Sequence, residues 1–348
     1  MNTSAKINLK GYNLDEITAQ MASLGKKPYR ARQIYQWLYQ KNATNWAQMT
    51  NISLALRTEL AGLFDLNTLS LKNSMKSALD GSEKFLFELI DGNLIEAVYM
   101  PEERRRTVCL SSQVGCPVGC TFCATGIMGL KRNLSAGEIV DQLLFINAHI
   151  HQPVTNVVFM GMGEPFLNYE NVMRAAQIFN SELGPELSAR HITISTCGII
   201  PGIKRFTAED QRYKLAISLN ATTDEQRNQI IPVNKKYQIA DLLNTAKNYT
   251  RVSRRRVTFE YILIAGLNDT MADAHRLVAM LSPIPCKLNL IPYNANPQFP
   301  FRAPSEEHLN EFIREIYRAP FAVTVRRSKG LDIAAACGQL YVSGRIKR

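Results

Sequence analysis

The sequence has no long apolar run. Nowhere do about eighteen uncharged apolar residues follow one another, and the opening MNTSAKINLKGY contains no continuous hydrophobic stretch. A membrane-spanning helix needs roughly 20 apolar residues, and a signal peptide needs an apolar core of about 7 to 15. The sequence therefore predicts neither, and we expect a cytoplasmic protein without a membrane partner.

Low-complexity tracts and fixed-period repeats are also missing, which argues against a disordered chain or a repeat architecture. The hydrophobic content of 46% and the charged content of 20% are those of an ordinary soluble globular protein. A chain of 348 residues can bury a sizeable core. These features predict one large domain with a smaller attachment.

Acidic residues are scarce relative to basic ones, with 30 Asp and Glu against 41 Lys and Arg, a net charge of +11. This balance favours a polyanionic partner, nucleic acid first and a membrane surface second. The basic residues gather in short runs that fit RNA contact and an ordinary solvated surface equally well. They are Lys26, Lys27, Arg30 and Arg32, residues 104–106, Arg251 with residues 254–256, and the RIKR tail at 345–348.

The chain organisation follows from the period of its apolar residues. Residues 13–65 have helical spacing, as in LDEITAQMASLG and ARQIYQWLYQK, so we predict a small helical accessory domain over residues 1–70. The runs KFLFELI and LIEAVYM, separated by Asp91-Gly92, predict a β-hairpin-like linker over residues 71–104.

From residue 105 to 348, strand-like and helix-like runs alternate. The strand-like runs are TVCLSS, TNVVFMG, HITIST, KLAISL, VTFEYIL, CKLNLIPY and FAVTVRR, and five of the connecting segments have helical periodicity. This alternation predicts an α/β fold with a parallel sheet, as a complete or partial (β/α) barrel of the TIM type. In such barrels, chemistry takes place at the C-terminal ends of the strands.

Three of the seven cysteines lie in Cys116-Pro-Val-Gly-Cys120-Thr-Phe-Cys123, in a loop after the first strand-like run. An odd cysteine count fits thiolate ligands and reactive thiols better than a disulfide framework. A structural zinc site needs a fourth ligand, and His149 and His151 lie without metal-ligand spacing in another segment. Three cysteines on a cubane would leave one iron open for another ligand.

This CxxxCxxC pattern, with Phe122 before its last cysteine, resembles the radical S-adenosylmethionine (SAM) superfamily. The resemblance implies a [4Fe-4S] cluster held by Cys116, Cys120 and Cys123, whose open iron chelates SAM. It also implies that Gly163-Glu164, in MGMGEP, receives the amino group of the cofactor's methionine. The segment also reads as a simple strand-to-helix turn.

Further cofactor contacts are expected where strand-like runs end. Ser195 lies at the end of HITIST, Ser218-Leu219-Asn220 ends KLAISL, and Asn294 follows CKLNLIPY. The C-terminal ends of parallel strands meet at one edge, so these residues are predicted to bind the cofactor.

Longer matches are more specific. SSQVGCPVGCTFCATG, GLKRNL, GMGEP, NLIPYN and DIAAACGQL, in this order, resemble the RlmN and Cfr family of RNA adenine methyltransferases over roughly residues 90–342. The helical N-terminal unit also fits this family. The Pro165-Phe-Leu-Asn sequence is nearer the RlmN pattern. Cys197 and Cys286 are predicted to be small core residues.

The resemblance implies a mechanism with two SAM molecules per turnover. Cys337 would be methylated by the first, and a radical made from the second would activate that methyl group for addition to the adenine. Attack of Cys109 on the Cys337 sulfur would then release the base and leave a transient disulfide. Glu96 matches a possible proton acceptor, although a carboxylate in an alternating strand more often faces solvent.

The implied substrates are carbon 2 of the adenosine in the peptidyl-transferase centre of 23S rRNA and of adenosine 37 in tRNA. An external one-electron reductant such as flavodoxin would be required, and a monomer is expected. Relatives usually have Ser-Leu-His where this chain has Ser218-Leu219-Asn220, so Asn220 is expected to bind but not to shuttle protons. Alternatives are Cfr-like methylation of carbon 8, a radical SAM enzyme with a non-RNA substrate, and a non-catalytic iron–sulfur or zinc RNA-binding module.

Overall fold

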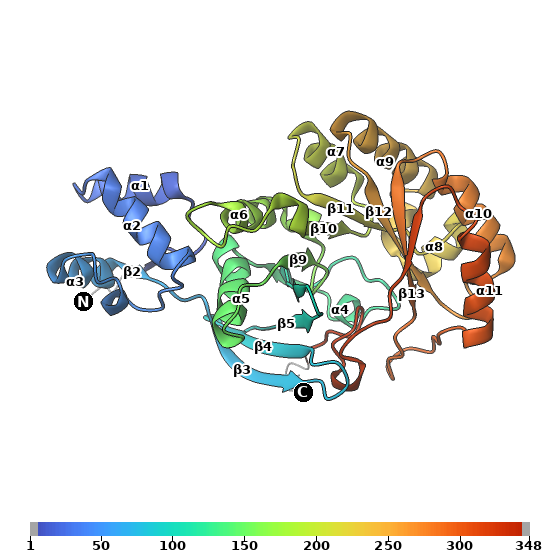
Figure 1. Ribbon diagram of the computed structural model, residues 1–348, viewed down its shortest axis with the longest axis horizontal. Coiled ribbons are helices and arrows are strands. Elements are labelled where there is room, and N and C mark those ends of the chain that lie inside the picture. Colours follow the sequence, from blue (N-terminus) through green and yellow to red (C-terminus); the bar gives the residue numbers. More distant parts are fainter. Residues whose placement is uncertain (1–5, 343–348) are drawn as a thin grey trace.

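The computed structural model describes residues 6–342, so the predicted basic tail at 345–348 lies outside the described residues. The N-terminal part is a helical unit at one side of the molecule (Figure 1). It contains β1 (Ile7–Asn8), α1 (Leu14–Ser23), α2 (Pro28–Tyr39), η1 (Trp46–Gln48), α3 (Leu54–Leu63) and β2 (Phe64–Asp65). The predicted helices are confirmed, and a capping box between Asn13 and Glu16 begins the first of them.

The rest of the described chain is built on a ten-stranded sheet in the order β14-β13-β12-β11-β10-β9-β6-β5-β4-β3. Its strands are β3 (Leu69–Lys76), β4 (Glu83–Leu89), β5 (Leu94–Pro101), β6 (Arg106–Cys109), β9 (Asn156–Phe159), β10 (Ile192–Thr196), β11 (Lys214–Ser218), β12 (Val257–Leu263), β13 (Cys286–Pro292) and β14 (Ala322–Val325). All seven strands predicted after residue 105 are present, and they pair in parallel in sequence order. The α/β prediction is confirmed, and the parallel strands form a partial barrel.

The predicted hairpin at Asp91-Gly92 joins β4 and β5, but it does not stand apart as a linker. β3, β4 and β5 pair antiparallel, and β5 also pairs with β6, with Val98 opposite Cys109. Residues on both faces of β5 are buried, including Ile95 and Glu96. The segment therefore extends the barrel sheet, and Glu96 is buried instead of facing solvent as a carboxylate in an alternating strand usually does.

Helices run along the outer side of the strands (Figure 1). The five predicted helices are present as α5 (Ala136–His149), α6 (Tyr169–Asn180), α9 (Ile239–Ser253), α10 (Met271–Leu281) and α11 (Glu306–Ile316). The short α4 (Ala124–Ile127), α7 (Ile200–Ala208) and α8 (Asp224–Ile230) were not predicted. α7 was missed because it contains Pro201 and Gly202, which are poor helix formers. Short 3₁₀ turns complete the connections, as η2 (Pro165–Asn168), η3 (Ala189–His191), η4 (Pro232–Lys235) and η5 (Leu331–Ile333).

The helical unit is attached to the barrel through α5. Lys10 Nζ lies 2.8 Å from Asp141 Oδ1, and both side chains are buried. The other oxygen of Asp141 accepts hydrogen bonds from the backbone and hydroxyl of Thr68. A Cβ added at Gly11 would lie 2.3 Å from the backbone nitrogen of Gly137, so the two backbones are in direct contact. Among residues 6–342, no helix combines the length and apolarity needed to cross a membrane.

Candidate active site

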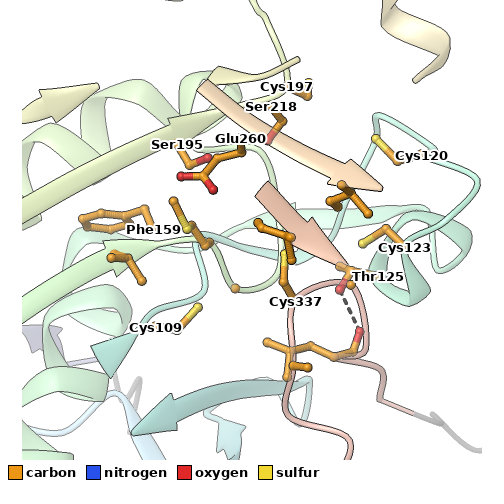
Figure 2. A pocket seen from close by; sticks show the side chains of 18 of the residues that line it. Cys109, Cys120, Cys123, Thr125, Phe159, Ser195, Cys197, Ser218, Glu260 and Cys337 are labelled. Carbon is orange, nitrogen blue, oxygen red and sulfur yellow. Dashed lines mark hydrogen bonds between the residues drawn. The ribbon is translucent and has the colours of Figure 1, made fainter. Parts of the chain in front are cut away.

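A cavity opens at the C-terminal ends of the parallel strands and is closed on one side by the C-terminal segment (Figure 2). Ten of the residues predicted from the sequence line it, namely Cys109, Cys116, Cys120, Cys123, Gly163, Glu164, Ser195, Ser218, Asn220 and Cys337. Leu219, Asn294 and Glu96 do not line this cavity. The tertiary structure therefore brings Cys337 together with the cysteines of residues 109–123, which lie more than 200 residues away in the chain.

The loop that carries Cys116, Cys120 and Cys123 is closed at its base by two short antiparallel strands, β7 (Gln113–Gly115) and β8 (Leu130–Asn133). The N–H of Cys116 donates to the carbonyl of Gly129 at 2.9 Å. Gly115 has a φ of +78°, and a Cβ there would lie 1.8 Å from that carbonyl oxygen. Only glycine fits this close crossing, so the two strands fix where the cysteine loop begins and ends.

The far side of the loop is held by α8. The backbone N–H and the hydroxyl of Thr121 donate to the carbonyls of Ile230 and Gln229, each at 3.1 Å. Cys123 is the residue that precedes α4, and its N–H donates to Cys120. The three cysteines are thus positioned by hydrogen bonds at both sides of the loop.

Burial raises the pKa of all three thiols, that of Cys116 to about 12. The charges of Cys123 and Cys116 raise the pKa of Cys120 further, because the three groups are close together. The thiols are therefore protonated at neutral pH, and metal binding must displace their protons.

Within residues 6–342, no three His, Cys, Asp or Glu side chains converge on a point suited to a single ion. A cubane does not require such convergence, because each of its thiolates binds a different iron. Three soft thiolate donors around one cavity therefore fit an iron–sulfur cluster better than a single zinc ion.

Glu164 joins the ends of two strands. Its backbone N–H donates to Gln113 Oε1 at 2.8 Å, and its carboxylate accepts from the N–H groups of Phe166 and Cys197. Gly163 has a φ of +103°, and a Cβ there would lie 2.6 Å from Gln113 Cβ. Gly163 is thus required because its backbone passes close to β7. Both carboxylate oxygens of Glu164 already accept hydrogen bonds from backbone N–H groups. Cys197, predicted as a core residue, is buried but also lines the cavity, whereas Cys286 lies in the core.

The C-terminal segment with Cys337 is anchored to three parts of the fold. Ala124 N–H donates to the Gly338 carbonyl at 2.8 Å, and Thr125 Oγ1 to the Leu340 carbonyl at 2.7 Å. Asn294 Nδ2 donates to the Cys337 carbonyl at 3.1 Å, so Asn294 positions this segment. The segment is also bound at the turn between β3 and β4, where Asp332 accepts from Ser77 and Ala78.

Glu96 belongs to the same set of anchors. It is 4% exposed, its Oε1 lies 3.1 Å from Lys84 Nζ, and its Oε2 accepts from the Tyr341 N–H at 3.0 Å. Burial raises the pKa of this carboxyl, and the ammonium of Lys84 opposes the rise. These contacts hold the C-terminal segment in place. The proton-acceptor role stays a prediction, and Glu96 does not reach the cavity wall.

Cys109 and Cys337 both face the cavity as free thiols (Figure 2). Cys109 is buried on β6, whereas Cys337 is exposed, although the surrounding protein partly removes water from its thiol. Burial raises the pKa of Cys109 to about 11 and that of Cys337 to about 12, and the positive charge of Arg326 opposes both shifts. Arg326 also lines the cavity. The rule that site residues follow strand ends could have found it, because it directly follows β14.

Two further residues of the site were missed. Arg227 of α8 is fully buried, and its guanidinium donates to the carbonyls of Leu219, Ser218 and Cys197 and to Asn234 Oδ1. Glu260 on β12 lines the cavity among the polar strand ends. No local signal marks either residue, because a charged side chain in a short polar helix or in an alternating strand is usually exposed.

Two family models match parts of this chain. Residues 7–66 match the ribosomal RNA large subunit methyltransferase N-terminal domain, and residues 110–278 match the radical SAM superfamily. A dual-specificity RNA methyltransferase RlmN from an Anaeromyxobacter species is 47% identical over 345 residues, 97% of this chain and 91% of the relative. The chain belongs to the RlmN family of radical SAM methyltransferases. An RlmN from Geobacter sulfurreducens is 46% identical, over 96% of this chain and 92% of its own.

The RlmN family assignment agrees with the fold. A radical SAM methyltransferase from Sphaerobacter thermophilus has a TM-score of 0.92 and 43% sequence identity, over 96% of this chain and 99% of that chain. The predicted radical SAM barrel with an N-terminal accessory unit is thereby confirmed. The protein is a SAM-dependent enzyme, and radical SAM enzymes work with SAM and a [4Fe-4S] cluster.

Proposed function

We propose that this enzyme methylates carbon 2 of an adenosine in the peptidyl-transferase centre of 23S rRNA and of adenosine 37 in tRNA. The observation that carries the proposal is that Cys109 and Cys337 face the same cavity as the three-cysteine loop. The RNA substrate is supported by the relatives, which are named dual-specificity RNA methyltransferases. The choice of carbon 2 rests on the Pro165-Phe-Leu-Asn sequence.

Cys116, Cys120 and Cys123 would hold the cluster, with SAM at the open iron beside Gly163, Ser195 and Ser218. When bound, this pair supplies a methyl group and, from a second SAM, a 5′-deoxyadenosyl radical. The carbon between two ring nitrogens of adenine is electron-poor, so it resists ordinary attack on a methyl cation equivalent but accepts a carbon radical. A thiol that carries the methyl group can provide such a carbon radical, because a hydrogen atom can be removed from the methyl group while it is bound to sulfur.

Cys337 would act first as a nucleophile, losing its proton and taking the methyl group on sulfur. After hydrogen is abstracted from that methyl group, a carbon–carbon bond would join it to the adenine. The ring would then lose one proton to a base and one electron, which the oxidised cluster held by Cys116, Cys120 and Cys123 would accept. Cys109 thiolate then attacks the Cys337 sulfur. The carbon–sulfur bond breaks, its electron pair and a proton complete the new methyl group, and external thiols reduce the disulfide.

Release of the base is expected to become faster as the pH rises. The reactive form of Cys109 is the thiolate, and its pKa is raised to about 11. Below that pKa, the thiolate fraction rises about tenfold with each pH unit. Single-turnover rates of release, measured by rapid quenching between about pH 7 and 9, should follow this slope. Arg326→Gln should slow release at any pH in this range, because Arg326 favours the thiolate. A release rate that does not depend on pH would contradict the role of Cys109.

The decisive experiment is anaerobic reconstitution of the full chain with iron, sulfide, SAM and RNA, followed by mass spectrometry of the nucleosides. The expected products are 2-methyladenosine and 5′-deoxyadenosine. 8-Methyladenosine would establish Cfr-like regiochemistry instead. Deoxyadenosine without any methylated nucleoside would indicate a non-RNA substrate, and the absence of deoxyadenosine would overturn the radical mechanism.

We further propose that the helical unit, residues 1–70, contacts RNA phosphates through its basic residues, and that the target adenine leaves its stack to enter the cavity. A flavodoxin-type one-electron donor would reduce the cluster. The RNA substrates are consistent with a cytoplasmic enzyme, and we expect it to act as a monomer.

A further inference from the structure

Nine basic side chains gather where the parallel strands begin, at the end of the sheet opposite the cavity. They lie in the residues that enter β6, β10, β11 and β12 and at the second residue of β13. All are exposed except Arg255, which is half-buried. We call this set the strand-start surface, and it consists of Arg104, Arg105, Arg190, Arg212, Lys214, Arg254, Arg255, Arg256 and Lys287.

The sheet brings these residues together from separate parts of the chain. Lys214 begins β11, and Lys287 lies near the start of β13, two strands away. The turn before β12 packs on the turn before β11, because Arg255 Nη1 donates to the Gln211 carbonyl at 2.7 Å. Neighbouring strands lie about 4.8 Å apart, so the strands from β6 to β13 present this surface over roughly 24 Å.

Two of the lysines lie on the inner face of the barrel. Alternate residues of a strand share one face, so Lys214 shares a face with Ser218, and Lys287 shares a face with Ile291. Both Ser218 and Ile291 line the cavity. They stand at the C-terminal ends of their strands, whereas the two lysines stand at the N-terminal ends. The lysines therefore belong to a surface that is separate from the cavity with the cysteines.

The positive charges of the strand-start surface are almost uncompensated. Within residues 6–342, Arg255 is the one member that forms an ion pair, with Asp210 at 3.3 Å. Burial lowers the pKa of Lys214, and the charges of Lys287 and two of the arginines lower it further. Like charges held this close repel one another and destabilise the compact protein. A bound polyanion would remove that cost.

RNA fits this surface better than an acidic protein does. The acidic protein that the proposed mechanism requires is a one-electron donor. It must come close to the iron–sulfur cluster, which would lie at the other end of the strands. RNA has no such constraint, because the large RNA substrates extend far beyond the target adenosine. A nucleic acid strand carries a phosphate on every nucleotide, so it can follow a row of cations over this length.

We propose that the strand-start surface binds the phosphate backbone of the substrate RNA at a place remote from the target adenosine. The inference rests on the proposed function and adds a second contact with the same RNA. Contacts to phosphates position a nucleic acid without reading its sequence. This contact favours a large folded RNA, whose backbone can reach both ends of the barrel, over a short hairpin that carries only the target adenosine.

The test measures the affinity of the full chain for protein-free 23S rRNA and for a hairpin with the target adenosine, by filter binding at several salt concentrations. The strand-start variant, with Arg190→Gln, Lys214→Gln and Lys287→Gln, should bind 23S rRNA about tenfold or more weakly. The slope of log affinity against log salt should become shallower by about 2 to 3, since each phosphate contact contributes roughly 0.7 to 0.9. Binding and methylation of the hairpin should not change.

A matched control removes the same charge from the outer helices. Lys204, Lys247 and Arg314 are exposed on α7, α9 and α11. The control variant, with all three replaced by Gln, should bind both RNAs like native protein. Thermal unfolding and iron content verify that both variants are folded and loaded, and reduced flavodoxin should reduce the cluster at the native rate in both.

The proposal is overturned if the strand-start variant binds 23S rRNA as tightly as native protein, or if the control variant loses as much affinity. Equal loss of hairpin affinity would also overturn it, because the surface would then hold the target segment instead of remote RNA. Slower reduction of the cluster by flavodoxin, with native RNA affinity, would assign the surface to the electron donor. Failure of native protein to methylate either RNA would contradict the proposed function, and the binding comparison would still decide this proposal.

Discussion

Cys109→Ala should halt the reaction with the RNA covalently attached to Cys337. In the proposed sequence, carbon–carbon bond formation needs only Cys337, whereas release needs the Cys109 thiolate to attack the Cys337 sulfur. Both thiols line one cavity, so removal of Cys109 takes away the attacking thiol but leaves the attachment point. The variant should accumulate close to one adduct per active chain, visible on a denaturing gel and by mass spectrometry. Steady-state turnover should fall by about a hundredfold or more.

Two variants complete this test. Cys337→Ala removes the attachment point and should give neither adduct nor product while still binding SAM. Cys286→Ala is the matched control, because Cys286 is a buried cysteine outside the cavity wall. It should retain near-native turnover. Release of methylated RNA by Cys109→Ala at the native rate would refute the two-cysteine mechanism.

Arg227→Met should destabilise the protein by about 3 kcal/mol or more. The guanidinium is fully buried and donates hydrogen bonds to three carbonyls and to Asn234. Methionine has a comparable length but donates none of these bonds, so several buried acceptors would lose their partners. The cost appears as a lower free energy of unfolding, measured by chemical denaturation of the cluster-free protein.

The same substitution should reduce cluster loading. α8 carries Arg227 and also accepts the hydrogen bonds that position Thr121 between Cys120 and Cys123. Iron bound per chain after reconstitution should therefore fall. Arg318→Met is the control, because Arg318 is exposed on the surface, and its replacement should change stability and iron content little. Unchanged stability in Arg227→Met would show that the buried hydrogen bonds contribute nothing.

Local patterns in the sequence were sufficient for the seven parallel strands and most of the helices. The strands are buried runs of β-branched and aromatic residues, and each is followed by a polar turn. This pattern can be recognised in the sequence without knowledge of the fold. The rule that chemistry gathers at strand ends then placed Ser195, Ser218 and Asn220 correctly in the cavity wall. It was less successful for Leu219, whose side chain faces away, because adjacent residues of a strand point to opposite sides.

Glu96 and Glu260 show why the rest escaped prediction. Both stand in alternating strands, LIEAVYM and VTFEYIL, where a carboxylate ordinarily faces water. Each is buried here because both faces of its strand are covered, and that depends on which strands become neighbours. The same is true of Arg227. The polar sequence of α8 predicts an exposed helix, and only the tertiary structure shows the backbone carbonyls that bind the Arg227 guanidinium.

By itself the sequence determined the α/β alternation, the three-thiol loop and, through its resemblance, the family. Those features depend on residue order and spacing over short stretches. Only the tertiary structure decided that Glu96 anchors the C-terminal segment, that Arg227 lies buried under the strand ends, and that Glu260 lines the cavity with an unpaired oxygen. Burial and partner choice arise from contacts between segments far apart in the chain, which no local pattern specifies.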